Sequence, residues 1–217
     1  MTKEQSIKLI SLFYAHLLHV EDVCSNPEAE SDGMLNLSIS ILNELKALSV
    51  QEIIEILKND YEEFKISTSE IPQFSSFEDV VFRVPYLTIA SRETNIPFIQ
   101  MGYMLLTIPK KDGAYFKYGE NQAKTAALIG LCAVRKGKIN PSYLGIAYTR
   151  LTKDEQKDIV PKLLLFMPII QNFFVMGMNV EQLREYFSLL SESTQIRRWS
   201  NVKTLINTVG KFIGYEL

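Results

Sequence analysis

The final part of the chain, from Thr194 to Ile213, constrains the fold more than any other segment, because its apolar residues recur at helical spacing. At about 100° per residue, its apolar side chains gather on one face of a helix. They are Ile196, Trp199, Val202, Ile206, Val209 and Ile213. Such a stripe is typical of an amphipathic helix that packs against a core. We therefore predict a long helix at 194–213 in a protein that is mostly helical.

The opposite face of this helix is polar and carries no acidic residue. From Ser193 to Tyr215 the chain has four basic residues and no acidic one. Arginine can bond guanine through two hydrogen bonds, asparagine can read adenine, and hydroxyl groups can contact phosphates or bases. The alternative is an ordinary solvated face, although such faces usually mix glutamate with lysine. We predict DNA contacts from Thr194, Arg197, Arg198, Ser200, Asn201, Thr204 and Lys211.

The overall net charge of −2 hides a division between two halves of the chain. Residues 1–95 hold 7 basic and 16 acidic residues, a net charge of −9, whereas residues 96–217 hold 16 basic and 9 acidic residues, a net charge of +7. Halves of opposite charge indicate two different partners. We expect the basic half to contact a polyanion. The acidic half would then serve a homodimer or a protein partner.

The acidic half is predicted to be mainly helical. Ser49 followed by Glu52 fits a capping box at the start of a helix. Further on, prolines and many Ser and Thr residues break the periodicity, and Val80–Val84 and Tyr86–Ala90 are candidate short strands. The expected helices cover residues 3–24, 34–48 and 50–63, with a loop at 25–33.

Residues 95–143 are predicted to combine two helices with a basic hairpin. We expect helices at Phe98–Leu106 and Glu120–Leu131, then a β-hairpin over 132–143 that turns at Gly137-Lys138. Small residues on the second helix would let it pack close to its partner: Ala123, Ala126, Ala127 and Gly130. The predicted DNA contacts are Asn121, Gln122, Lys124 and Thr125 on the helix, and Arg135, Lys136 and Lys138 on the hairpin. A packing helix beside a solvated hairpin is the alternative.

The remaining residues are predicted to be mainly helical. Thr152 and Glu155 fit a second capping box. The stretch that they open would be interrupted by Pro161 and Pro168 and would reach about residue 175. A short helix at 180–190 and a turn at 191–193 would then lead into the long helix at 194–213.

One run of residues resembles a known family. The run from Phe98 through Met101-Gly102-Tyr103 and Tyr118-Gly119-Glu120-Asn121 to Ala127–Leu131 is similar to winged helix-turn-helix domains of prokaryotic DNA-binding proteins. The likeness is greatest to the DNA-reading modules of restriction–modification and other defence-linked proteins. It implies tandem modules, the second starting at Tyr143-Leu144-Gly145. It also implies recognition helices at 120–131 and 194–213, with a wing after each. Residues 1–95 carry none of the resemblance.

These observations predict a mostly α protein with small β-hairpin wings. The expected division is a helical domain at 1–94, a first winged-helix module at 95–151 and a second at 152–217. The expected function is sequence-specific binding of double-stranded DNA, as a transcriptional regulator or as the recognition component of a restriction–modification or defence system. No cofactor is expected. A cytoplasmic location is expected because no apolar run reaches the roughly 18 residues of a membrane span, and because the two cysteines lie far apart.

Three rival functions stay open at this point. The first is a protein-interaction adaptor built on winged helices. The second is a metal-dependent nuclease, for which Asp60 and the step Glu63-Phe64-Lys65 have a suitable form, although Glu155-Gln156-Lys157 shows how common such triplets are. The third is a metal site at His16 and His19 with Cys24, but further ligands are lacking, which favours partly buried histidines of a helical core. The chain has no Gly-rich phosphate loop and no nucleophile elbow. We therefore do not expect an enzyme.

Overall fold

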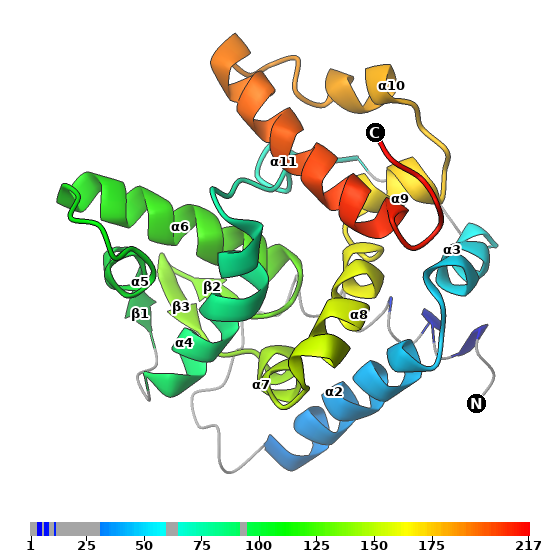
Figure 1. Cartoon of the computed structure of the whole chain (residues 1–217), viewed down its shortest axis with the longest axis horizontal. Coiled ribbons are helices and arrows are strands. Elements are labelled where there is room, and N and C mark those ends of the chain that lie inside the picture. Colours follow the sequence, from blue (N-terminus) through cyan, green and yellow to red (C-terminus); the bar gives the residue numbers. More distant parts are fainter. Residues whose placement is uncertain (1–3, 6, 9–10, 12–30, 60–64, 92–94) are drawn as a thin grey trace.

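The computed structural model of the chain describes residues 4–5, 7–8, 11, 31–59, 65–91 and 95–217. This part is mostly helical and contains one three-stranded antiparallel sheet, so the predicted mostly α class is confirmed (Figure 1). None of its helices combines the length and the apolar composition that a membrane span needs.

Two helices of the acidic half form close to the positions predicted at 34–48 and 50–63, although the first begins inside the loop predicted at 25–33. Helix α2 spans Ser31–Lys46 and helix α3 spans Val50–Lys58. Ser49 and Glu52 form both hydrogen bonds of the capping box, which confirms this prediction and fixes the start of α3. The predicted helix at 3–24 and the end of the one at 50–63 lie largely outside the described residues.

The strands predicted at 80–84 and 86–90 are wrong. Asp79–Arg83 forms one turn of π-helix, η1, and Val84–Ala90 forms helix α4. The valines that suggested strands are buried on the inner side of this helical stretch. Pro85 is tolerated because it lies in the first turn of α4, where a backbone N–H has no partner within the helix. Arg83 donates a hydrogen bond of 3.0 Å to Asp79 one turn earlier, which ties the turn together.

The predicted hairpin is confirmed and belongs to a small sheet. Strands β2, Ala133–Arg135, and β3, Lys138–Asn140, are joined by Lys136 and Gly137, both with positive φ (46° and 73°). Such a turn matches the twist of paired strands, and it lies one residue before the predicted position. Strand β1, Ile96–Pro97, pairs antiparallel with β3, so the order across the sheet is β1-β3-β2.

Helices α5, Phe98–Leu105, and α6, Asp112–Leu128, lie between β1 and β2 in the chain and pack tightly together. Helix α6 begins eight residues before its predicted start at 120, so Gly113 and Gly119 lie within it. Gly119 has a packing role. A Cβ on Gly119 would lie 2.0 Å from the carbonyl oxygen of Phe98, so only glycine fits this crossing.

Residues 141–217, all of which the structure describes, contain helices and no strand. The wing predicted for a second winged-helix module is therefore absent, and this expectation is corrected. Thr152 and Glu155 do form the predicted capping box, but Pro161 lies inside a helix rather than interrupting it. The helices are α7, Tyr143–Thr149; α8, Lys153–Leu164; α9, Pro168–Phe174; α10, Val180–Glu185; and α11, Glu192–Gly210.

The apolar core passes across the boundary expected between residues 94 and 95. Helix α2 packs against α7 and α8, and α3 packs against α8 (Figure 1). On its other side α8 contacts α11, so its wholly buried residues Leu163 and Leu164 lie near the centre of the molecule. The division into three domains stays a prediction, and the first part of the chain shares its core with the last.

Candidate nucleic-acid interface

The outward side of α6 carries a short row of polar residues. Lys117 and Lys124 are exposed, while Glu120 and Asn121 are half-buried. Glu120 is three residues from Lys117 and four from Lys124, and Asn121 is three residues from Lys124. Residues at these spacings are neighbours on one side of a helix. The opposite side packs on α5 and includes the wholly buried Ala123 and Ala126. Lys124 is thus exposed on this side of α6, and Asn121 beside it is half-buried.

Phe98 connects this row to the turn of the hairpin. The ammonium nitrogen of Lys124 lies 5.9 Å from the centre of the Phe98 ring, within cation–π range. A Cβ on Gly137, at the hairpin turn, would lie 4.0 Å from the edge of the same ring. Phe116 of α6 contacts the ring from another direction, with its centre 5.7 Å away at 83°. The C-terminal half of α6 and the hairpin turn therefore form one continuous surface.

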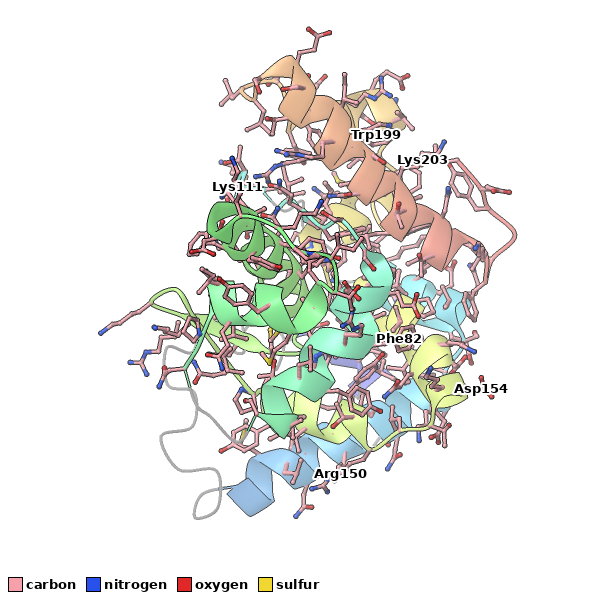
Figure 2. All side chains as sticks on the ribbon, turned by 60° about the vertical axis from the view of Figure 1, so that its left-hand side comes forward. Phe82, Lys111, Arg150, Asp154, Trp199 and Lys203 are labelled. Atoms are coloured by element: carbon pink, nitrogen blue, oxygen red, sulfur yellow. The ribbon has the colours of Figure 1, made fainter. Side chains whose placement is uncertain are left out.

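The hairpin side chains Arg135, Lys136 and Lys138 are exposed, as predicted. No acidic residue in the described ranges forms an ion pair with any of them. Most cations on the helices behave differently, for example Lys58 with Glu55 and Lys157 with Asp154. In Figure 2 the hairpin loop lies at the left edge of the view, with side chains that point away from the protein. Its positive charge is thus available to an external anion.

Glu120 interrupts the positive charge of α6. Its two carboxylate oxygens accept hydrogen bonds from Lys117, at 2.6 Å, and from Lys124, at 2.8 Å. Burial alone would raise the pKa of Glu120, but the hydrogen bonds and charges of the two lysines outweigh it and lower the pKa. Glu120 is therefore ionised at neutral pH and sits between two cations.

The contacts predicted for Gln122 and Thr125 need correction, because both side chains are buried. Gln122 donates from Nε2 to the carbonyl oxygen of Ser76 at 3.1 Å. The hydroxyl of Thr125 donates to the carbonyl oxygen of Gln73 at 2.9 Å and accepts from the backbone N–H of the same residue at 3.2 Å. These polar groups bind residues 65–78, which we call the bridging segment, and cannot face an outside ligand.

Helix α11 bears out only part of its predicted polar face. Arg197, Ser200, Thr204 and Lys211 are exposed, and Thr194 is half-buried. The sequence reading missed Lys203, which is also exposed and is labelled with Trp199 on α11 in Figure 2. In that view Lys111, at the start of α6, lies on the opposite side of the upper part of the molecule.

Asn201 and Arg198 do not belong to the exposed face of α11. Asn201 is buried with 7% of its surface exposed, so the predicted contact with a base is corrected. Arg198 is half-buried and donates from Nη1 to the carbonyl oxygens of Thr68 and Ile71, which lie in the bridging segment. The apolar stripe is also rotated from its predicted position, since Ile196 is 66% exposed while Leu205 is buried. The bridging segment consequently holds α6 and α11 together.

The nuclease and metal-site hypotheses depend mostly on residues that the structure does not describe. Asp60, Glu63, His16, His19 and Cys24 lie outside the described residues. Glu155 is engaged in the cap of α8 and in an ion pair of 2.7 Å with Lys46 of α2. Among the residues that the structure describes, no group of three or more His, Cys, Asp or Glu side chains could hold a metal ion.

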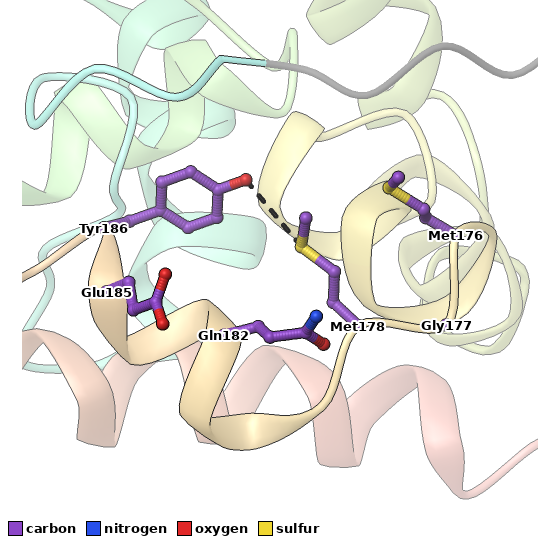
Figure 3. A pocket seen from close by; sticks show the side chains of 6 residues that line it. All are labelled: Met176, Gly177, Met178, Gln182, Glu185 and Tyr186. Atoms are coloured by element: carbon purple, nitrogen blue, oxygen red, sulfur yellow. Dashed lines mark hydrogen bonds between the residues drawn. The ribbon is translucent and has the colours of Figure 1, made fainter.

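A pocket of about 330 Å³ lies where α9 leads into α10 (Figure 3). Its lining has no histidine, cysteine, lysine or arginine. The Tyr186 hydroxyl donates to the sulfur of Met178 at 3.7 Å and accepts from the side chain of Asn172 at 2.9 Å. Because these two hydrogen bonds engage the Tyr186 hydroxyl, the lining of the pocket suggests no particular reaction. The residues that line the pocket are Met176, Gly177, Met178, Gln182, Glu185 and Tyr186.

No family model, no curated protein and no solved structure matches this chain. The resemblance to winged helix-turn-helix domains therefore stays a prediction. The geometry of the chain's own residues is the basis on which a function can be proposed.

Proposed function

We propose that this chain binds double-stranded DNA through residues 84–140. In this proposal α6 enters the major groove, which admits one helix, and the β2–β3 hairpin lies against the neighbouring phosphates. The order of elements supports it: helix α4, strand β1, helices α5 and α6, then a hairpin whose second strand pairs with β1. This is the order expected of one winged helix-turn-helix module.

The observation that carries the proposal is the meeting of α6 and the hairpin at Phe98. It brings Lys124 next to the turn of a hairpin whose three cations have no ion pair with any described acidic residue. Unpaired cations on a shared surface favour phosphate binding, because each contact releases a condensed counterion from the DNA. Asn121, half-exposed beside Lys124, is the amide on this surface that can reach a base edge.

A second basic face lies on α11 and is the main competitor as a DNA contact. Its exposed cations are Arg197, Lys203 and Lys211, and from Ser193 to Tyr215 the chain has no acidic residue. It has no hairpin beside it, since residues 141–217 form no strand. We therefore place the principal DNA contact on α6 and the hairpin.

Two triple variants separate these faces while changing the total charge by the same amount. The first is Arg135→Gln, Lys136→Gln, Lys138→Gln on the hairpin, and the second is Arg197→Gln, Lys203→Gln, Lys211→Gln on α11. Binding to a random duplex is titrated against salt, where each lost phosphate contact flattens the slope of log K against log[salt] by about 0.9. We expect the hairpin variant to flatten the slope by up to about 2.7 and the α11 variant to leave it nearly unchanged. The reverse pattern would move the DNA face to α11.

The biological role proposed for this binding is transcriptional regulation or DNA recognition in a restriction–modification or defence system. Selection of bound sequences from a random duplex pool would show whether the chain prefers one site. An adaptor function is the second candidate, favoured by Leu189, in the link between α10 and α11, and by Ile196, in the second turn of α11, which are 92% and 66% exposed. It would replace DNA binding if the wild-type chain ignored duplexes even at low ionic strength.

A further inference from the structure

Glu120 is an unexpected residue on a surface proposed to bind DNA. Helix α6 holds two acidic residues, and the other, Asp112, lies in its first turn and accepts a hydrogen bond of 2.7 Å from Tyr103. Glu120 instead lies in the middle of the helix, on the side that carries Lys117, Asn121 and Lys124. A carboxylate in this position repels the phosphates of every DNA sequence equally.

The contacts of Glu120 show how the two lysines are held in the free protein. Lys117 and Lys124 lie on either side of it at 2.6 Å and 2.8 Å. The side chain of Glu120 is only 13% exposed, whereas those of Lys117 and Lys124 are 68% and 56% exposed. The largely buried carboxylate thus lies between two exposed cations, and it would lose both hydrogen-bond partners if the lysines turned to phosphates.

Phosphates compete with Glu120 for these lysines when DNA binds. A carboxylate left without the lysines can only accept hydrogen bonds, and the donors in the major groove are the amino groups of cytosine (N4) and adenine (N6). Guanine and thymine edges present acceptors there and would leave the charge unpaired. A cytosine or adenine next to Glu120 therefore offsets the repulsion between its carboxylate and the phosphates, whereas a guanine or thymine does not.

We propose that Glu120 is a specificity-determining residue: it lowers affinity for arbitrary DNA and selects adenine or cytosine, rather than guanine or thymine, at the one position that it reaches. This inference rests on the proposed binding of DNA by α6. It does not depend on which sequence is bound, since it concerns one position in the recognised site.

The test compares Glu120→Gln with Glu55→Gln. Glu55 makes a matched control because it also pairs with a lysine three residues away, Lys58 at 3.2 Å, but lies on α3. For Glu120→Gln we expect tighter binding to random duplex and a salt slope steeper by about 0.9 for each lysine released. Sequence selection is expected to lose a preference of about fivefold or more at one position. Glu55→Gln should match the wild type in both measurements.

The outcomes separate this inference from the function on which it rests. If the wild-type chain binds no duplex at low salt, the proposed function fails, and the inference fails with it. If the wild type binds and Glu120→Gln keeps the same salt slope and the same preference at every position, the inference alone fails. Glu120→Ala provides a second variant, and the circular dichroism of each variant verifies that it is folded.

Discussion

A methyl group on Gly119 would lie 2.7 Å from the backbone nitrogen of Gly102, so α5 and α6 cross with their backbones in contact at these two residues. Gly102 is equally confined, since its Cβ would lie 2.0 Å from the carbonyl oxygen of Tyr115. The crossing fixes the position of α6 relative to the sheet, and it therefore also fixes the surface proposed to bind DNA.

Gly119→Ala is expected to destabilise the protein by about 3 kcal/mol or more, because α5 and α6 would have to separate. The free energy of unfolding in urea measures the effect. Gly113→Ala is the control, since it lies in the same helix with no atom within 4 Å of the added carbon. It is expected to stabilise by up to about 1 kcal/mol through helix propensity. Equal effects of the two substitutions would contradict the close crossing.

Arg198→Ala is expected to lower the free energy of unfolding by about 1.5–3 kcal/mol, because it removes charged hydrogen bonds to the carbonyl oxygens of Thr68 and Ile71. The neighbouring Arg197→Ala removes the same side chain from an exposed position and should change stability by less than about 0.5 kcal/mol. Urea denaturation of both variants measures the difference. A similar loss from both would show that the bridging segment is not held by Arg198.

The ion pair between Glu155 and Lys46 predicts a dependence of stability on pH. Hydrogen bonds from Lys46, and then from the backbone and hydroxyl of Thr152, lower the pKa of Glu155 from 4.5 to about 2. The carboxylate is thus favoured in the folded state, so its contribution is complete above pH 4.5 and is lost as the pH falls towards 2. The stability difference between the wild type and Glu155→Gln should shrink across this window. A difference independent of pH would contradict the ion pair.

Cys132 is expected to resist thiol reagents in the native protein. Its side chain is buried with its sulfur 3.3 Å from the carbonyl oxygen of Ala123, and burial raises the pKa of the thiol to about 12. Since the thiolate is the reactive form, labelling at pH 8 should leave the Cys132 peptide unmodified in the native state and modify it in urea. Peptide mass spectrometry distinguishes this site from Cys24. Rapid native labelling would show that this part of the core opens.

The sequence reading succeeded where local signals decide the structure. The capping boxes at Ser49 and Thr152 and the hairpin turn at Gly137 depend on residues at most a few positions apart. The exposure of Arg135, Lys136 and Lys138 followed from that turn. Local pattern alone was therefore enough to locate the hairpin part of the proposed surface.

Local sequence signals do not predict the parts of the structure that a distant partner decides. Thr125 is buried because its hydroxyl bonds Gln73, which is 52 residues away in the chain. Lys117 lies outside the helix predicted at 120–131, because the close fit of Gly119 against Phe98, inside the longer helix, becomes visible only in three dimensions. The buried stripe of α11 differs from the predicted one because helical spacing cannot show which neighbouring elements cover a face. Ile196, for example, is apolar but 66% exposed.

Helix α2 covers α7 and α8, so the acidic half of the chain shields apolar surface that belongs to the basic half. An excised fragment that began at residue 95 would carry that surface into water and would aggregate rather than fold. The basic half as a whole is consequently not a portable module that could be transplanted onto another protein. Evolution of the two halves would be linked, since a change in size on α2 demands a compensating change on α7.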